Sequence, residues 1–259
     1  NIYMTDKMVE AYLKALENEE RAAATVEKYR RALLSFAAFL SGAAVTPEMI
    51  RLWKDDLRAR NYVPSTINTY LAALNGFFRF CGWADCRARF LKIQRRLFRD
   101  SKQELTRAEY ECLVAAAEAA GDHGLALLME TICSTGIRVS EVQYITVEAA
   151  KNGKTEIALK GKIRTILLPA KLCRKLLKFA ARQKTASGAI FRAKSGKSMS
   201  RYQIWPKMKK LCVRAGVDAG KVFPHNLRHL FATAFYRAYK DIVKLADVLG
   251  HSSIETTRI

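Results

Sequence analysis

Residues 224–229 read Pro-His-Asn-Leu-Arg-His, and residues 249–251 read Leu-Gly-His. His225 and Arg228 are three residues apart, so their side chains are neighbours on a helix. Pro224 favours the first helical position, where its missing N–H is not needed. Helix N-termini that carry such donors bind phosphate groups. These segments therefore predict a phosphate site built on helix starts, within a mainly helical fold.

A second arginine lies upstream, in residues 134–141, which read Ser-Thr-Gly-Ile-Arg-Val-Ser-Glu. Gly136 is a typical helix stop, and Arg138 lies between it and the next expected helix. A guanidinium there can donate two parallel hydrogen bonds to phosphate oxygens. The same side chain could instead form a surface ion pair with Glu141. This motif alone does not separate the two interpretations.

The whole chain is strongly basic, with 45 Lys and Arg against 24 Asp and Glu and a net charge of +21. The excess is larger in the second part: residues 1–100 carry 17 basic against 11 acidic side chains, and residues 101–259 carry 28 against 13. This balance favours nucleic acid as the partner. Half of the residues are hydrophobic, which supports a sizeable core and excludes a disordered basic tail.

Other classes of protein fit the sequence poorly. There is no apolar run of 18 residues and no signal peptide, so we expect a cytoplasmic protein without a membrane partner. Six scattered cysteines without a C-x-x-C pair are typical of buried free thiols in a reducing compartment. His225 and His229 lack the glutamate of a zinc-binding H-E-x-x-H motif, so no metal site is expected. Phe191 replaces a glycine that a nucleotide-binding loop would need before Gly196-Lys197-Ser198, and no cofactor is predicted.

The first part of the chain predicts a bundle of four helices. Apolar residues recur at helical spacing from Val26 to Leu40. Thr46-Pro47 and Pro64-Ser65 are two further helix starts. We assign residues 1–97 to this helical domain, and the polar, aperiodic residues 98–105 to a linker.

Residues 106–259 predict a second, α+β domain, which is mainly helical with a small β-hairpin. Thr106 and Glu109 fit a capping box that starts a new helical pattern. Strands are expected at 155–159 and 163–168, because apolar and polar residues alternate on both sides of Lys160-Gly161-Lys162. A short β segment is expected at 189–191. The expected helices cover 107–120, 124–134, 170–182, 201–215, 225–239 and 241–249, with another helix starting after Arg138.

The order of these motifs is more specific than any one of them. Arginine in T-G-x-R-x-S-E, lysine in a hairpin, H-x-L-R-H and then L-G-H follow one another, and the chain resembles the tyrosine recombinase family, most closely its Xer-like members. The resemblance covers nearly the whole chain. It implies a SAM-like core-binding domain that clamps DNA, followed by a catalytic domain. The implied activity is site-specific recombination or integration through a 3′-phosphotyrosine intermediate, without metal or ATP.

The resemblance assigns four residues to the scissile phosphate. Arg138 and Arg228 would hold its non-bridging oxygens, and His251 would donate a hydrogen bond to it. Glu141 would orient Arg138. Fixed donors of this kind stabilise the charge that a phosphodiester gains in the transition state.

Three further residues would move protons. Lys160, with Lys162 as the alternative, would protonate the leaving 5′ oxygen, and His225 would act as general base or acid toward the nucleophile. In this family the nucleophilic tyrosine lies nine residues after the L-G-H histidine, which corresponds to position 260, whereas the chain ends at Ile259. We therefore expect a catalytic domain cut just before its nucleophile, able to bind DNA but not to cleave it.

Contacts with DNA are expected from both domains. Residues 201–215 predict a basic helix with Trp205 and Leu211 on its inner face, which suits either a helix along DNA phosphates or a solvated surface. We expect DNA contacts from the following residues: Lys28, Arg31, Thr66, Arg201, Tyr202, Lys207 and Lys210.

The resemblance implies double-stranded DNA as the partner, a homo-tetramer on DNA in the full-length protein, and an accessory directionality factor. Chromosome-dimer resolution and mobile-element integration both remain open. One alternative is a type IB topoisomerase-like enzyme, which shares the chemistry but rejoins the same strand. Another is a non-catalytic DNA-binding regulator on the same scaffold.

Overall fold

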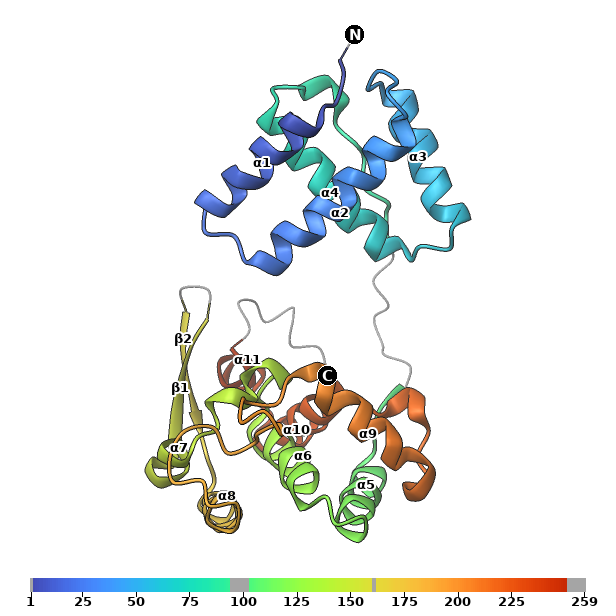
Figure 1. Cartoon of the computed structure of the whole chain (residues 1–259). Coiled ribbons are helices and arrows are strands. Elements are labelled where there is room, and N and C mark those ends of the chain that lie inside the picture. Colours follow the sequence, from blue (N-terminus) through green and yellow to red (C-terminus); the bar gives the residue numbers. More distant parts are fainter. Residues whose placement is uncertain (1, 94–102, 160–161, 251–259) are drawn as a thin grey trace. The chain divides into compact units, whose positions relative to one another are not determined.

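The computed structural model of the chain describes residues 2–93, 103–159 and 162–250 (Figure 1). The chain divides into two compact units, Asn1–Leu97 and Phe98–Ile259. The fold class predicted from the sequence is confirmed, because both units are mainly helical and the described strands form one two-stranded sheet.

The first unit is a bundle of four helices. Thr5 and Thr46 cap two of them with their hydroxyl oxygens, each of which accepts a backbone N–H three residues later. Phe36, Trp53 and Phe77 are fully buried between the helices and form the centre of the core. The elements are α1 (Asp6–Asn18), α2 (Ala23–Leu40), α3 (Pro47–Ala59), α4 (Pro64–Phe80) and the short 3₁₀ helix η1 (Ala84–Cys86).

The second unit surrounds one central helix, α6 (His123–Thr135). Residues 125–129 of α6 are all buried, and the helix packs against α5, α8, α9 and α10. A helix that is apolar on every side must lie inside the domain. The other helices are α5 (Arg107–Ala119), η3 (Val139–Tyr144), α7 (Val147–Asn152), α8 (Ala170–Arg182), α9 (Arg201–Ala215), η4 (Ala219–Lys221), α10 (Pro224–Tyr239) and α11 (Ile242–Leu249).

The hairpin stands at one edge of the second unit (Figure 1). Strands β1 (Lys154–Leu159) and β2 (Lys162–Leu167) pair antiparallel, with Ile157 opposite Arg164. Side chains alternate between the two faces of a strand. Ile157 and Ile166 are buried, whereas Ile163 is exposed, so one face of the hairpin packs on the unit.

A helix starts after Arg138, as predicted, and it is the 3₁₀ helix η3, a common kind of short connector. The short helix α7 that follows it was not predicted. Two local expectations are wrong. The β segment at 189–191 is a single bridge between Thr146 and Ala189. All six cysteines are free thiols, but Cys112 is exposed and only half of the six are fully buried.

Within the described ranges, every helix is too short or too polar to cross a lipid bilayer. The same residues contain no group of three or more His, Cys, Asp or Glu side chains arranged to hold a metal ion.

Candidate active site

The junction between α6 and η3 positions Arg138. Gly136 ends α6 in the left-handed conformation, with φ of +66°, and a Cβ atom there would lie 2.4 Å from the Phe231 ring. Two residues later, the Arg138 backbone N–H donates to Oε2 of Glu141 at 2.7 Å, and its Nη1 donates to Oε1 at 2.9 Å. Glu141 therefore orients both the backbone and the side chain of Arg138.

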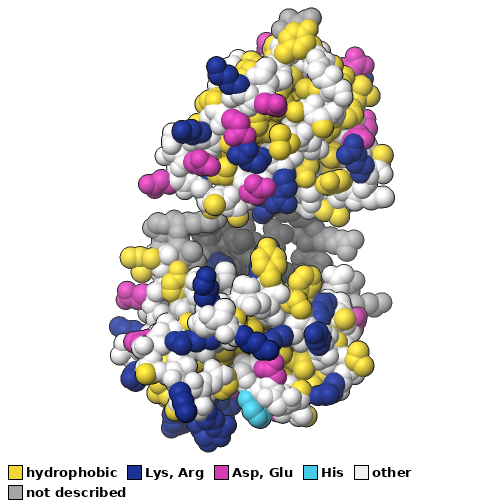
Figure 2. All heavy atoms as spheres, viewed as in Figure 1, with side chains coloured by type: hydrophobic (Ala, Val, Ile, Leu, Met, Phe, Trp, Pro, Cys, Tyr) yellow, Lys and Arg dark blue, Asp and Glu magenta, His cyan; other side chains and the backbone are white. Residues whose placement is uncertain are grey.

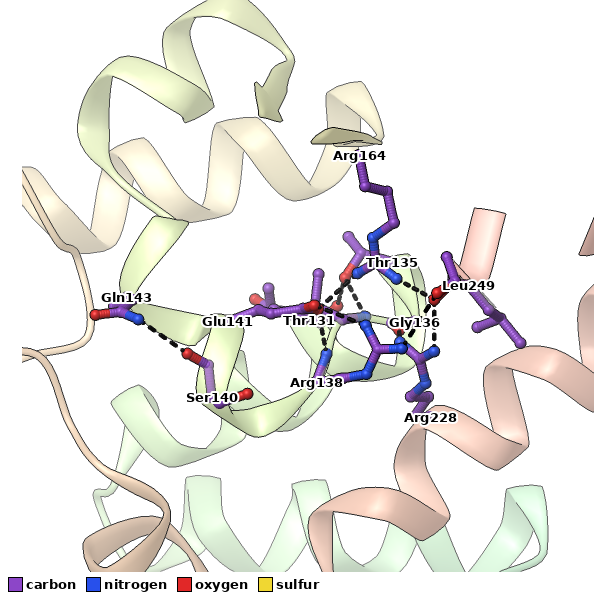
Figure 3. Close-up of polar contacts among 12 residues, drawn as sticks. Thr131, Thr135, Gly136, Arg138, Ser140, Glu141, Gln143, Arg164, Arg228 and Leu249 are labelled. Carbon is purple, nitrogen blue, oxygen red and sulfur yellow. Dashed lines mark hydrogen bonds and ion pairs between the residues drawn. The ribbon is translucent and has the colours of Figure 1, made fainter. Parts of the chain in front are cut away.

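Helix α10 positions Arg228. Pro224 starts this helix, and Arg228 follows one turn later with only 4% of its surface exposed. Its Nη1 donates to the Gly136 carbonyl, and its Nη2 donates to the Leu249 carbonyl at 2.7 Å. The side chain thus joins the ends of α6 and α11, as Figure 3 shows.

A third arginine, Arg164, enters the same cluster from strand β2 (Figure 3). Its Nη2 donates to Oε2 of Glu141 at 2.6 Å, and its Nη1 donates to the Leu249 carbonyl. The side chain is 11% exposed. Arg164 is not among the site residues predicted from the sequence. The signal that could have found it is strand alternation, because Arg164 lies two residues before buried Ile166 and so belongs to the inner face.

The cluster carries an excess of positive charge. Among the described residues, Arg138 and Arg164 both contact the carboxylate of Glu141, whose side chain is 1% exposed. Arg228 lies beside them and shares the Leu249 carbonyl with Arg164. Burial lowers the pKa of Arg228, and the charges of Arg138 and Arg164 lower it further against the opposing effect of Glu141. Burial likewise lowers the pKa of Arg164. The pKa of Arg228 is lowered only to about 9, so this group stays protonated at neutral pH. A bound anion would offset the excess positive charge of the cluster.

The structure brings together three of the predicted site residues: Arg138, Glu141 and Arg228. His225 is exposed at the second position of α10, one turn before Arg228. Lys162 starts β2, and its backbone pairs with that of Leu159. Lys160 and His251 lie outside the described residues.

The start of α10 is held to the beginning of the second unit. Asn226 is buried, and its Nδ2 donates to the carbonyls of Gln103 and Lys221, each at 2.8 Å. His229 Nε2 lies 3.2 Å from a carboxylate oxygen of Glu104. These contacts fix the orientation of the helix that carries Arg228.

The residues predicted to contact DNA are mostly exposed. On α9, Arg201 stacks over the Tyr202 ring at 4.7 Å, and both side chains are exposed, as is Lys210. Lys207 forms an ion pair with Asp122 at 3.0 Å. The inner position predicted for Trp205 is wrong, since it is 49% exposed, with its indole N–H donating to the Val222 carbonyl.

In the first unit, Lys28 and Arg31 are exposed on α2, and Thr66 is half-buried in the first turn of α4. Arg31 lies 3.5 Å from Glu27 on the same helix. In the view of Figure 2, Lys and Arg side chains are more prominent than acidic ones over the second unit.

The chain is similar in sequence to two tyrosine recombinases over nearly its whole length. Tyrosine recombinase XerA of Pyrococcus furiosus is 29% identical over 265 residues, which covers 99% of this chain and 89% of XerA. Tyrosine recombinase XerD of Brucella melitensis is 31% identical over 280 residues, which covers 97% of this chain and 91% of XerD.

Two solved structures share the fold. A lambda integrase fragment, in a dimer bound to a COC′ core site, has a TM-score of 0.80 at 17% identity and covers 100% of this chain and 96% of that one. XerH site-specific recombinase bound to difH substrate has a TM-score of 0.73 at 21% identity. The match covers 98% of this chain and 81% of the XerH chain.

Family models match both units. The model of the phage integrase N-terminal SAM-like domain matches residues 9–85. The model of the phage integrase family matches residues 103–259, which include the whole arginine cluster. The chain therefore belongs to the phage integrase family.

Proposed function

We propose that this chain belongs to a site-specific tyrosine recombinase and supplies its DNA-binding surfaces and the residues that hold the scissile phosphate. The observation that carries the proposal is the cluster of three arginines: Arg138 and Arg164 share the Glu141 carboxylate, and Arg164 and Arg228 share the Leu249 carbonyl. A site with this excess of fixed cationic donors suits a phosphodiester, which carries one negative charge and gains more in its transition state. The XerA and XerD relatives, both named tyrosine recombinases, support the same assignment.

In the proposed reaction, Arg138 and Arg228 hold the two non-bridging oxygens of the scissile phosphate. Arg138 is 41% exposed and has donors free of Glu141 that can turn toward DNA. The guanidinium of Arg228 is held by its hydrogen bonds to the Gly136 and Leu249 carbonyls. Because both arginines are held by their own partners, they would stabilise the transition state without rearrangement.

The proton transfers involve residues on either side of this clamp. The nucleophile is the tyrosine that the family resemblance places at position 260; it would attack phosphorus and give its proton to His225. The bond from phosphorus to the 5′ oxygen breaks, and Lys160 or Lys162 protonates that oxygen. His251 donates to the phosphate. The products are a 3′-phosphotyrosine and a free 5′ hydroxyl, and the partner strand's 5′ hydroxyl reverses the steps, so the bond energy is retained and ATP is not consumed.

We assign residues 1–97 to DNA clamping, 98–105 to a linker and 106–259 to catalysis. The DNA surface would include Lys28, Arg31 and Thr66 of the first unit and the exposed start of α9. DNA in the lambda integrase and XerH complexes supports double-stranded DNA as the partner. Exchange between two duplexes requires four active sites, so we propose a homo-tetramer on DNA, with an accessory factor setting direction. The free cysteines fit action in the cytoplasm.

The test uses the protein with the natural C-terminus of its gene. This protein is incubated with nicked DNA carrying candidate target sites, and covalent protein–DNA adducts are separated under denaturing conditions. We expect an adduct that is lost with phenylalanine at position 260. Relaxation of supercoiled plasmid without strand exchange would instead favour a topoisomerase. Salt-sensitive DNA binding without an adduct would favour a non-catalytic regulator.

A further inference from the structure

Arg164 touches the partners of both proposed phosphate-binding arginines. It shares the carboxylate of Glu141 with Arg138, and it shares the Leu249 carbonyl with Arg228. Through these shared acceptors, one side chain of the hairpin connects η3, the end of α11 and α10. Figure 3 shows its guanidinium between Glu141 and Leu249.

The two oxygens of the Glu141 carboxylate accept hydrogen bonds from different groups of the two arginines. Its Oε1 accepts only from Nη1 of Arg138, at 2.9 Å, among the described side chains. Its Oε2 accepts from the Arg138 backbone N–H at 2.7 Å and from Arg164 Nη2 at 2.6 Å. An arginine beside a carboxylate frequently binds both oxygens through two parallel N–H groups. Here Arg164 and the Arg138 backbone N–H share Oε2, and the Arg138 guanidinium contacts the carboxylate through Nη1 alone.

The position of Arg164 is also fixed from the other side. Gly250 follows α11 with φ of +63°, and a Cβ atom there would lie 2.5 Å from Cδ of Arg164. The arginine stem therefore packs directly on the backbone of Gly250, the residue before His251. A residue without a side chain is needed at 250 both for the left-handed turn and for this close approach.

We propose that Arg164 is a positioning residue for DNA cleavage, which prevents Arg138 from closing onto both oxygens of Glu141 and fixes the end of α11 beside Arg228. The inference rests on the function proposed above. It assigns the hairpin a second task besides carrying Lys160 and Lys162, which lie four and two residues before Arg164 in the sequence. Arg164 reaches its two acceptors with two separate nitrogens, Nη1 and Nη2. A lysine has a single nitrogen and lacks this planar geometry, so we do not expect it to replace the arginine.

The experiment measures the rate of adduct formation on nicked target DNA by the protein with its natural C-terminus. Protein is in saturating excess, so that DNA affinity does not limit the rate. Arg164→Met should slow cleavage by about 100-fold, the scale expected when a catalytic group is misplaced by about 1 Å. Arg164→Lys should remain at least about tenfold slow, because one ammonium group cannot reproduce the fork. Thermal unfolding identifies any variant that fails to fold, and Arg164→Lys then replaces Arg164→Met throughout.

The matched control is Lys154→Met, which removes one positive charge from an exposed position on the same hairpin. This variant should cleave at the unaltered rate. The control therefore distinguishes a rate loss caused by the missing contacts of Arg164 from one caused by the loss of a positive charge near DNA.

A double-mutant cycle with Glu141→Gln tests the route of the effect. If Arg164 acts on Arg138 through the carboxylate, adding Arg164→Met to Glu141→Gln should slow cleavage by far less than 100-fold, because the neutral amide no longer captures Arg138. The inference would be overturned if the double variant lost cleavage by the product of the two single-variant losses, or if Arg164→Lys cleaved at the unaltered rate. Either result would leave the proposed function intact. Absence of an adduct with the unaltered protein on every candidate site would overturn both.

Discussion

Trp53 and Phe36 lie fully buried in the first unit with their ring centroids 4.9 Å apart, whereas the second unit buries Arg228 and Glu141 as charged side chains. Aromatic burial stabilises a fold directly. Burial of a charged group costs several kcal/mol of desolvation free energy for each ion, which interactions with its partners must offset. Both units have a hydrophobic core, but among the described residues only the second also buries a cluster with excess positive charge, which is useful when an anion binds. Substitutions can separate these two roles, stability and anion binding.

The largest effect on stability should follow from Trp53→Ala in the first unit. Removal of a fully buried indole leaves a cavity, and the free energy of unfolding should fall by about 3–5 kcal/mol. Chemical denaturation followed by circular dichroism measures this loss. A change below about 1 kcal/mol would show that the bundle does not depend on its aromatic centre.

Arg228→Met should show the opposite pattern. Cleavage should fall by about 10²–10³-fold, or about 3–4 kcal/mol, because a fixed donor to the phosphate is lost. The free energy of unfolding should stay equal or rise, since an apolar side chain replaces one of three clustered positive charges. The same adduct assay and denaturation curve give both numbers. A large loss of stability would mean that the arginine is mainly structural.

Gly250→Ala should have a smaller effect, on both properties. Gly250 and Gly216 have nearly equal φ angles, +63° and +64°, so alanine at either position should cost about 1–2 kcal/mol of stability. A Cβ atom at Gly216 meets nothing within 4 Å, whereas one at Gly250 would push Arg164. Only Gly250→Ala should therefore slow cleavage. Equal cleavage rates for the two variants would argue against a role for the contact with Arg164.

The smallest effect should come from the exposed lysines of α9. Lys210→Ala should weaken DNA binding and reduce the slope of log affinity against log salt by about one. Lys207→Ala should change that slope less, because the Lys207 charge is already offset by Asp122 at 3.0 Å. Fluorescence anisotropy at several salt concentrations compares the two variants. An identical slope change would show that the ion pair opens when DNA binds.

The sequence could predict most of the secondary structure because its signals are local. Thr106 and Glu109 form the predicted capping box, and α8 and α9 have the predicted bounds. The hairpin forms where alternation predicted it, although each strand is shifted by about one residue. Local spacing also predicted the pairing of Arg138 with Glu141, three residues apart, as one of two alternatives.

Long-range contacts set the limits of that prediction. The inner position expected for Trp205 was wrong because neighbouring elements, and not helical spacing alone, determine which face of a helix is covered. The ion pair of Lys207 with Asp122 joins residues 85 positions apart, so local sequence patterns could not predict it.

By itself, the sequence determined the helices, the hairpin and the order of the arginine, lysine and histidine motifs, since caps, periodicity and turn residues act over a few positions. Tertiary structure decided which charges meet. Arg164 reaches Glu141 and Leu249, which lie 23 and 85 residues away, only because β1 of the hairpin packs beside η3 and β2 packs beside α11. The physical reason is that a side chain's hydrogen-bond partners depend on distance in space, which the packed core fixes.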